Sequence, residues 1–163
     1  MRIYRDNCCF GRPFDDQDFT RIFVETQAIL FVQEKIKSGV LELATSHILH
    51  YENSQCKNEI RKESVADFMK TYSKIHIDMN FGEKVLNLSE KIISTGVKPK
   101  DAYHVASAVL AECDYFLSTD DRLLKYKTSE IILLNPVEFI KILEENRYDT
   151  SRRFDGARHE VSD

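Results

Sequence analysis

The stretch from residue 98 to residue 121, KPKDAYHVASAVLAECDYFLSTDD, decides the fold. It predicts a helix with an acid in its first turn, and then a strand followed directly by two more acids. Pro99 suits that turn, where its missing N–H costs little, and Asp101 lies where a carboxylate favours the positive end of the helix dipole. Small and apolar residues then recur at helical spacing: Ala102, Ala106 and Val109. This spacing predicts a helix with one face smooth enough to press closely on a sheet.

The second half of the stretch predicts a strand and the turn in which it ends. Residues 115–117 (YFL) read as a short buried strand, and residues 118–121 (STDD) bring two acids directly after it. In an open parallel sheet, ligands bind at the carboxyl ends of the strands. Asp120 and Asp121 therefore lie where chemistry is expected.

The chain has 163 residues, which fits one domain with a proper core. Its net charge of −4 argues against broad attraction to nucleic acid, although divalent cations held by converging acids would reverse the sign locally. No apolar run approaches the roughly 20 residues that span a bilayer, and the N-terminus lacks the apolar region of a secretory signal. We expect a cytoplasmic protein without membrane contact.

Four cysteines fit a reducing compartment, because none of them shows the paired spacing of a zinc site: Cys8, Cys9, Cys56 and Cys113. We interpret them as buried thiols, and we find no role for the adjacent pair.

Predicted strands alternate with predicted helices along the chain. The strands cover residues 1–6, 40–44, 74–78, 115–117 and 131–134. The helices cover residues 19–37, 45–52, 56–71, 85–93 and 136–145, together with the one that begins at residue 98. This alternation predicts an α/β fold with three α/β/α layers and a mainly parallel central sheet. The domain is expected to span residues 1–146, followed by a polar tail of residues 147–163 without an apolar period.

Acids from distant parts of the chain are expected to meet at one edge of that sheet. Asp6 ends the first strand, Glu52 lies on an early helix, Asp101 heads a later helix, and Asp120 and Asp121 follow the fourth strand. Each acid alone has an ordinary explanation as a cap, a turn residue or a solvated side chain. Together they form a set of hard oxygen ligands that suits Mg²⁺ or Mn²⁺.

Several segments of the chain resemble the PIN domain family. They are IYRDN at the start, YEN around Glu52, DAYHVASA from Asp101, and DYFLSTDDRLLK from Asp114 with ILLNP after it. The resemblance extends from about Met1 to Leu143 and implies a PIN-like fold. It also implies a divalent-metal-dependent endoribonuclease that hydrolyses RNA phosphodiester bonds, often the toxin of a toxin–antitoxin pair.

The resemblance also implies roles for individual residues. By position, the acidic set that binds metal and carries catalysis comprises Asp6, Glu52, Asp101 and Asp121, and Asp120 is an auxiliary metal ligand. Thr119 matches the polar residue that precedes the last acid, and Asn7 replaces the hydroxyl residue that commonly follows the first acid. Both are candidates for substrate contacts, as are Arg12 and Arg122. Arg5 precedes the first acid where the family usually has an apolar residue, so it either holds Asp6 ionised or competes with the metal.

Basic residues beside these acids in the sequence are candidates for contacts to RNA phosphates. They are Arg12, Lys98, Lys100, Arg122 and Lys125. His104 follows Asp101 at i+3, so it either acts as a general base or packs as a hydrogen-bonded histidine.

Two functions from different classes remain open at this point. One is a metal-dependent ribonuclease, with an RNA substrate, a cognate antitoxin and a second copy of the chain as candidate partners. The other is a catalytically inactive PIN-like module that binds a protein or RNA partner. A phosphotransferase with Asp6 as nucleophile is disfavoured because position 8, where a second acid is needed, is Cys8.

Overall fold

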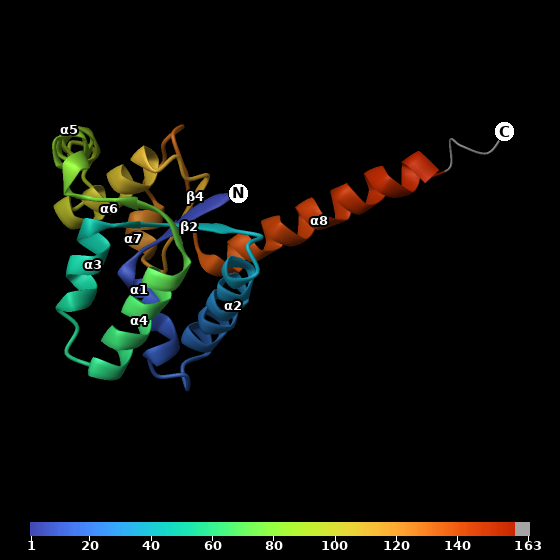
Figure 1. Cartoon of the computed structure of the whole chain (residues 1–163), viewed down its shortest axis with the longest axis horizontal. Coiled ribbons are helices and arrows are strands. Elements are labelled where there is room, and N and C mark those ends of the chain that lie inside the picture. Colours follow the sequence, from blue (N-terminus) through green and yellow to red (C-terminus); the bar gives the residue numbers. More distant parts are fainter. Residues whose placement is uncertain (159–163) are drawn as a thin grey trace.

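The computed structural model describes residues 1–158 and contains one five-stranded sheet in which every pairing is parallel (Figure 1). The strands are β1 (Arg2–Arg5), β2 (Glu42–Ser46), β3 (Ser73–Ile77), β4 (Tyr115–Leu117) and β5 (Ile132–Leu134). Their order across the sheet is β3-β2-β1-β4-β5. The predicted parallel α/β architecture is therefore confirmed.

Helices connect the strands and cover both faces of the sheet (Figure 1). They are α1 (Asn7–Gly11), α2 (Thr20–Lys37), α3 (His47–Ser54), α4 (Glu59–Tyr72), α5 (Gly82–Ile93), α6 (Pro99–Leu110), α7 (Asp121–Leu124) and α8 (Pro136–Arg158). Helices α5 and α6 pack on each other on one face, and α2 packs on α8 on the other. The three predicted layers are present.

The direction in which the chain adds strands to the sheet reverses between β1 and β4. The chain passes from β1 outward to β2 and β3, and then returns to place β4 on the other side of β1. Crossovers of fixed hand put the two sets of helices on opposite faces, which opens a crevice at the carboxyl ends of these two strands. Asp6 follows β1, and residues 118–120 follow β4.

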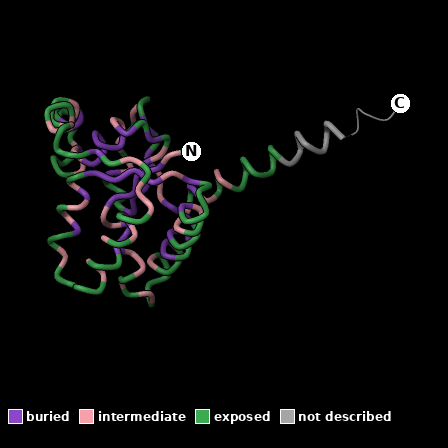
Figure 2. The backbone as a smooth tube through the Cα atoms, in the orientation of Figure 1, coloured by how far each residue is buried: buried purple, intermediate pink, exposed green. Residues whose placement is uncertain are grey.

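Small residues let α6 lie close to the sheet, as its spacing predicts. Ala102 and Ala106 are fully buried, whereas Val109 is only partly buried. The strands supply the other side of this core, where Tyr4 stacks on Phe116 with ring centroids 5.3 Å apart. Figure 2 shows that buried residues concentrate along the strands.

Two elements differ from the sequence-based expectation. Residues 7–11, expected as loop, form the short helix α1, because Asp6 caps it by accepting a hydrogen bond from the backbone N–H of Cys9. Helix α8 was expected to end near residue 145 but continues to Arg158 and leaves the body of the protein (Figure 1). Residues 144–150 of this helix are exposed. The last part of the predicted tail, residues 159–163, lies outside the described residues.

Within residues 1–158, no helix combines the length and the apolar character needed to cross a membrane.

The Arg5 side chain is buried against the aromatic rings of Phe10 and Phe68. It is 1% exposed, and its guanidinium carbon lies 4.0 Å from the ring centroid of Phe10 and 5.6 Å from that of Phe68. Burial lowers the pKa of Arg5 to about 10, although the nearby Cys9 and Asp6 favour its charged form. None of its three nitrogens has a hydrogen-bond partner among the described side chains and backbone. Arg5 is therefore a charged group held by ring contacts.

Replacing this arginine by an apolar side chain of similar length is expected to stabilise the protein. A buried donor without a partner costs about 1–3 kcal/mol, and cation–π contacts recover only about 0.5–2 kcal/mol. We expect Arg5→Met to raise the free energy of unfolding by about 1 kcal/mol in urea titrations. Arg5→Ala, which leaves a cavity beside Phe10, should lower it. A less stable Met variant would show that the ring contacts outweigh the cost of burial.

Candidate active site

A cavity of about 470 Å³ lies at the crevice between β1 and β4. Four acids line it, together with three cations, an amide, a thiol and an imidazole. The lining residues are Asp6, Glu52, Asp101, Asp120, Arg61, Lys98, Lys100, Asn7, Cys8 and His104. The parallel sheet thus brings acids from distant parts of the sequence to one place, as predicted from their positions after strands and in helices.

Asp6 is held at the end of β1 by the start of α1. Its Oδ1 accepts hydrogen bonds from the Cys9 backbone N–H at 3.2 Å and from the Cys8 thiol at 2.8 Å. The carboxylate is 7% exposed, and burial raises its pKa well above the usual range, an effect to which Cys8 adds. A cation beside Asp6 would favour the ionised carboxylate and oppose this shift.

Glu52 reaches the cavity from α3 and is held by two basic groups. Its Oε1 is hydrogen-bonded to His104 Nε2, and its Oε2 lies 3.5 Å from Lys100 Nζ. Burial works to raise the pKa of Glu52, but His104 and Lys100 outweigh it and the pKa is lowered. Glu52 is therefore favoured as a carboxylate.

His104 belongs to a buried chain of hydrogen bonds that ends on Glu52. Its Nδ1 lies 2.7 Å from Tyr4 Oη, and Tyr4 Oη lies 2.6 Å from Ser46 Oγ, which accepts from the Leu49 backbone N–H. One arrangement of protons satisfies every group: Ser46 donates to Tyr4, Tyr4 donates to His104, and His104 donates to Glu52. Of the two roles considered for His104, the structure supports the hydrogen-bonded one, in which it orients a carboxylate.

Asp101 on α6 and Asp120 in the turn after β4 both line the cavity. Burial raises the pKa of Asp101, and the charge of Asp120 is the next largest cause. Asp120 caps α7, where its Oδ1 accepts from the backbone N–H of Arg122 at 2.9 Å. This cap fixes the direction of the Asp120 side chain.

Asp121 lies outside the cavity, whereas the sequence predicted it as one of the four acids that bind metal and carry catalysis. Its two oxygens accept from Arg21 at 2.7 and 2.8 Å, and its side chain is 67% exposed. The pKa of Asp121 is lowered by this contact with Arg21. The reason is the start of α7: residue 120 caps the helix from inside the crevice, so residue 121 begins the helix and faces solvent. The structure brings together Asp6, Glu52, Asp101 and Asp120.

The residues predicted to touch substrate are dispersed. Asn7 lines the cavity, whereas Thr119 is nearly buried outside it and accepts from Arg21 through its carbonyl. Arg12 is bound to Asp15 and to Glu25, a helical residue that is 2% exposed. Arg122 is an exposed residue of α7. Sequence reasoning missed Arg61, because nothing local connects α4 with α1.

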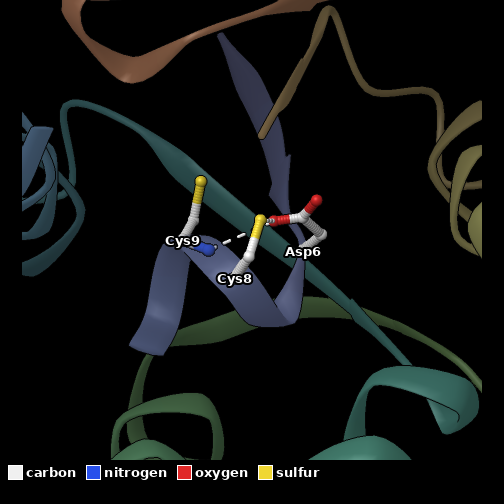
Figure 3. A group of neighbouring side chains, drawn as sticks. All are labelled: Asp6, Cys8 and Cys9. Carbon is white, nitrogen blue, oxygen red and sulfur yellow. Dashed lines mark hydrogen bonds between the residues drawn. The ribbon is translucent and has the colours of Figure 1, made fainter. Parts of the chain in front are cut away.

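The adjacent cysteines stand next to Asp6 (Figure 3). Ligand atoms of Asp6, Cys8 and Cys9 lie within 4.8 Å of one another. The Cys9 thiol is fully buried, points away from Asp6 in Figure 3 and donates to the Leu117 carbonyl at 3.3 Å. Only the Cys8 thiol faces the cavity, so the donors there are mainly carboxylate oxygens. Such a set fits a hard divalent cation, which would also offset the raised pKa values of Asp6 and Asp101.

Comparison with solved structures identifies the fold. No family model matches the sequence, and no curated protein matches it. Three similar solved structures are toxin–antitoxin complexes whose toxins are PIN domains. VapBC2 from Rickettsia felis bound to a promoter DNA fragment is 16% identical, with 83% of this chain and 98% of that chain covered and a TM-score of 0.51. FitAB bound to the IR36 DNA fragment is 16% identical, with 83% and 95% of the two chains covered and a TM-score of 0.53. FitAcB from Neisseria gonorrhoeae is 17% identical, with 82% and 97% covered and a TM-score of 0.51. The chain has the PIN-like fold that the sequence predicted.

The two adjacent acids give a direct test of the placement by α7. We expect Asp120→Asn to weaken Mn²⁺ binding about tenfold or more, because a cavity carboxylate is lost while asparagine keeps the helix cap. Asp121→Asn should change the affinity by less than about twofold, because an exposed ion pair contributes little. Titration calorimetry measures both. The reverse order of effects would mean that residue 121 is the ligand.

The buried hydrogen-bond chain also predicts a measurable effect on the metal site. Tyr4→Phe leaves His104 Nδ1 without its partner, so we expect a loss of about 1–3 kcal/mol in unfolding free energy and about tenfold weaker Mn²⁺ binding. Tyr148→Phe, at a tyrosine that is 71% exposed on α8, is the matched control and should change neither. An unchanged Mn²⁺ affinity in Tyr4→Phe would show that Glu52 needs no orientation through His104.

Proposed function

We propose that the chain is a divalent-metal-dependent endoribonuclease that hydrolyses RNA phosphodiester bonds, acting as the toxin of a toxin–antitoxin pair. The observation that carries the proposal is the convergence of Asp6, Glu52, Asp101 and Asp120 on one cavity of a PIN-like fold. Four carboxylates crowded in this way suit a divalent cation. The retained acids favour an enzyme over an inactive binding module.

Asp6, Glu52, Asp101 and Asp120 would hold Mg²⁺ or Mn²⁺. When bound, such a cation supplies Lewis-acid activation of water and neutralises charge on the phosphodiester. The chain itself would contribute orientation: α1 holds Asp6 through the Cys9 amide, and His104 holds Glu52. The ammonium groups of Lys98 and Lys100 line the same cavity and would attract the RNA backbone.

A cognate antitoxin is the partner that we propose for this protein, because the three similar structures are toxin–antitoxin complexes. A second copy of the chain is a further proposed partner. The four cysteines are free, which suits the reducing cytoplasm that we propose as the place of action.

Purified protein should cleave single-stranded RNA in the presence of Mg²⁺ or Mn²⁺, and EDTA should stop the reaction. Asp6→Asn and Asp101→Asn should each reduce cleavage at least about a hundredfold, because each removes a carboxylate from the cation site. Asp121→Asn, at the acid paired with Arg21, is the matched control and should cut at nearly the normal rate. Gel analysis of a labelled RNA measures all of these rates.

Equal cutting by Asp6→Asn, Asp101→Asn and the unaltered protein would point to a contaminant or to a different site. If calorimetry detected no divalent cation binding at all, the protein would instead be an inactive PIN-like module.

A further inference from the structure

Arg61 places a cation in the wall of the cavity. It stands in the first turn of α4, where its backbone N–H is bonded to the Asn58 side chain, and its own side chain reaches Gly11 at the end of α1. Among the described residues, no acid pairs with its guanidinium, and its Nε is buried without a hydrogen bond. By contrast, Arg12 and Arg21 are held by acids.

Gly11 forms the seat on which this guanidinium lies. A Cβ atom at position 11 would stand 2.2 Å from Nη2 of Arg61, 2.4 Å from its Cζ and 2.9 Å from its Nη1. The φ angle of Gly11 is −82°, a value that any residue adopts, so backbone strain does not require glycine here. Glycine is instead what lets the Arg61 guanidinium lie here, because a Cβ atom at position 11 would displace it. Two residues from separate elements thus fix where the cation stands.

The surroundings indicate what Arg61 binds. Helix α4 belongs to the crossover between β2 and β3, whereas Lys98 and α6 belong to the crossover between β3 and β4, which lies on the opposite face. The acids at the strand ends stand between these cations. The site therefore offers a cationic contact on either side of the acids.

We infer that Arg61, seated on Gly11, binds an RNA phosphate next to the one that is cleaved. The planar guanidinium presents a fork of N–H donors that matches two phosphate oxygens, and no acid among the described residues occupies that fork. The inference rests on the proposed ribonuclease function and adds a specific contact to it. Arg61 sets the position of the RNA strand, and the acids carry the reaction.

The test compares RNA with a substrate that has a single phosphodiester. Arg61→Met and Gly11→Ala should each raise KM for single-stranded RNA about tenfold, because a charge-assisted contact is lost, with kcat changed less than about threefold. Hydrolysis of bis(p-nitrophenyl) phosphate should stay the same in both variants, because this substrate has no neighbouring phosphate. The double variant should match the single ones, because both changes remove one contact.

Two matched control variants separate loss of the Arg61 contact from general effects of substituting a cation or a glycine. Lys62→Met removes the next cation of α4, which is paired with Glu59 at 3.0 Å, and should leave KM unchanged. Gly82→Ala introduces a Cβ with no atom within 4 Å and should also be neutral. Thermal unfolding checks that Gly11→Ala folds, and Arg61→Met tests the same contact without any change at the glycine.

A binding measurement keeps this inference separate from the proposed function. Anisotropy of a fluorescein-labelled oligouridylate, measured in Ca²⁺, should show weaker binding and a salt slope lower by about 0.7 in Arg61→Met. This holds even if the protein cuts no RNA. Unchanged binding and KM in Arg61→Met would overturn the inference, as would an equal loss on bis(p-nitrophenyl) phosphate, which would place Arg61 at the reaction itself.

Discussion

The parallel pairing of β1 with β4 is the constraint on which the site depends. The pairing ends at Arg5 and Leu117, and the Asp6 backbone N–H then donates to the Leu117 carbonyl at 3.2 Å. This bond fixes the first acid beside the turn that carries Asp120. Glu52 is added from the last turn of α3, and Asp101 from the first turn of α6.

Electrostatics explains why this cluster of acids needs a positive charge close to it. Burial raises the pKa values of Asp6 and Asp101, so burial opposes the ionisation of both carboxyl groups. Glu52 is treated differently, because His104 and Lys100 lower its pKa. The hydrogen-bond chain through Tyr4 fixes this contact from within the core. A divalent cation would shift the remaining acids in the same direction, which is the physical link between the geometry and the proposed chemistry.

Arginines in this structure serve three distinct purposes. Arg5 lies against aromatic rings and forms no hydrogen bond or ion pair with Asp6. It therefore neither holds Asp6 ionised nor competes with a metal through direct contact. Arg21 binds Asp121 and keeps that acid at the surface. Arg61 lies on Gly11 within the cavity. The type of residue is the same, and the packing around each guanidinium decides its role.

The sequence by itself determined the alternation of strands and helices, the parallel sheet and the meeting of distant acids at one edge, because hydrophobic period and strand ends are local properties. It placed Asp121 in the main acidic set and Asp120 in an auxiliary role, whereas the structure puts Asp120 in the cavity, because this placement depends on which residue caps α7. The sequence could not connect Arg61 with Gly11 or Tyr4 with His104, since these contacts join separate elements. Only the tertiary structure decided them, because side-chain direction and close approach follow from packing between elements.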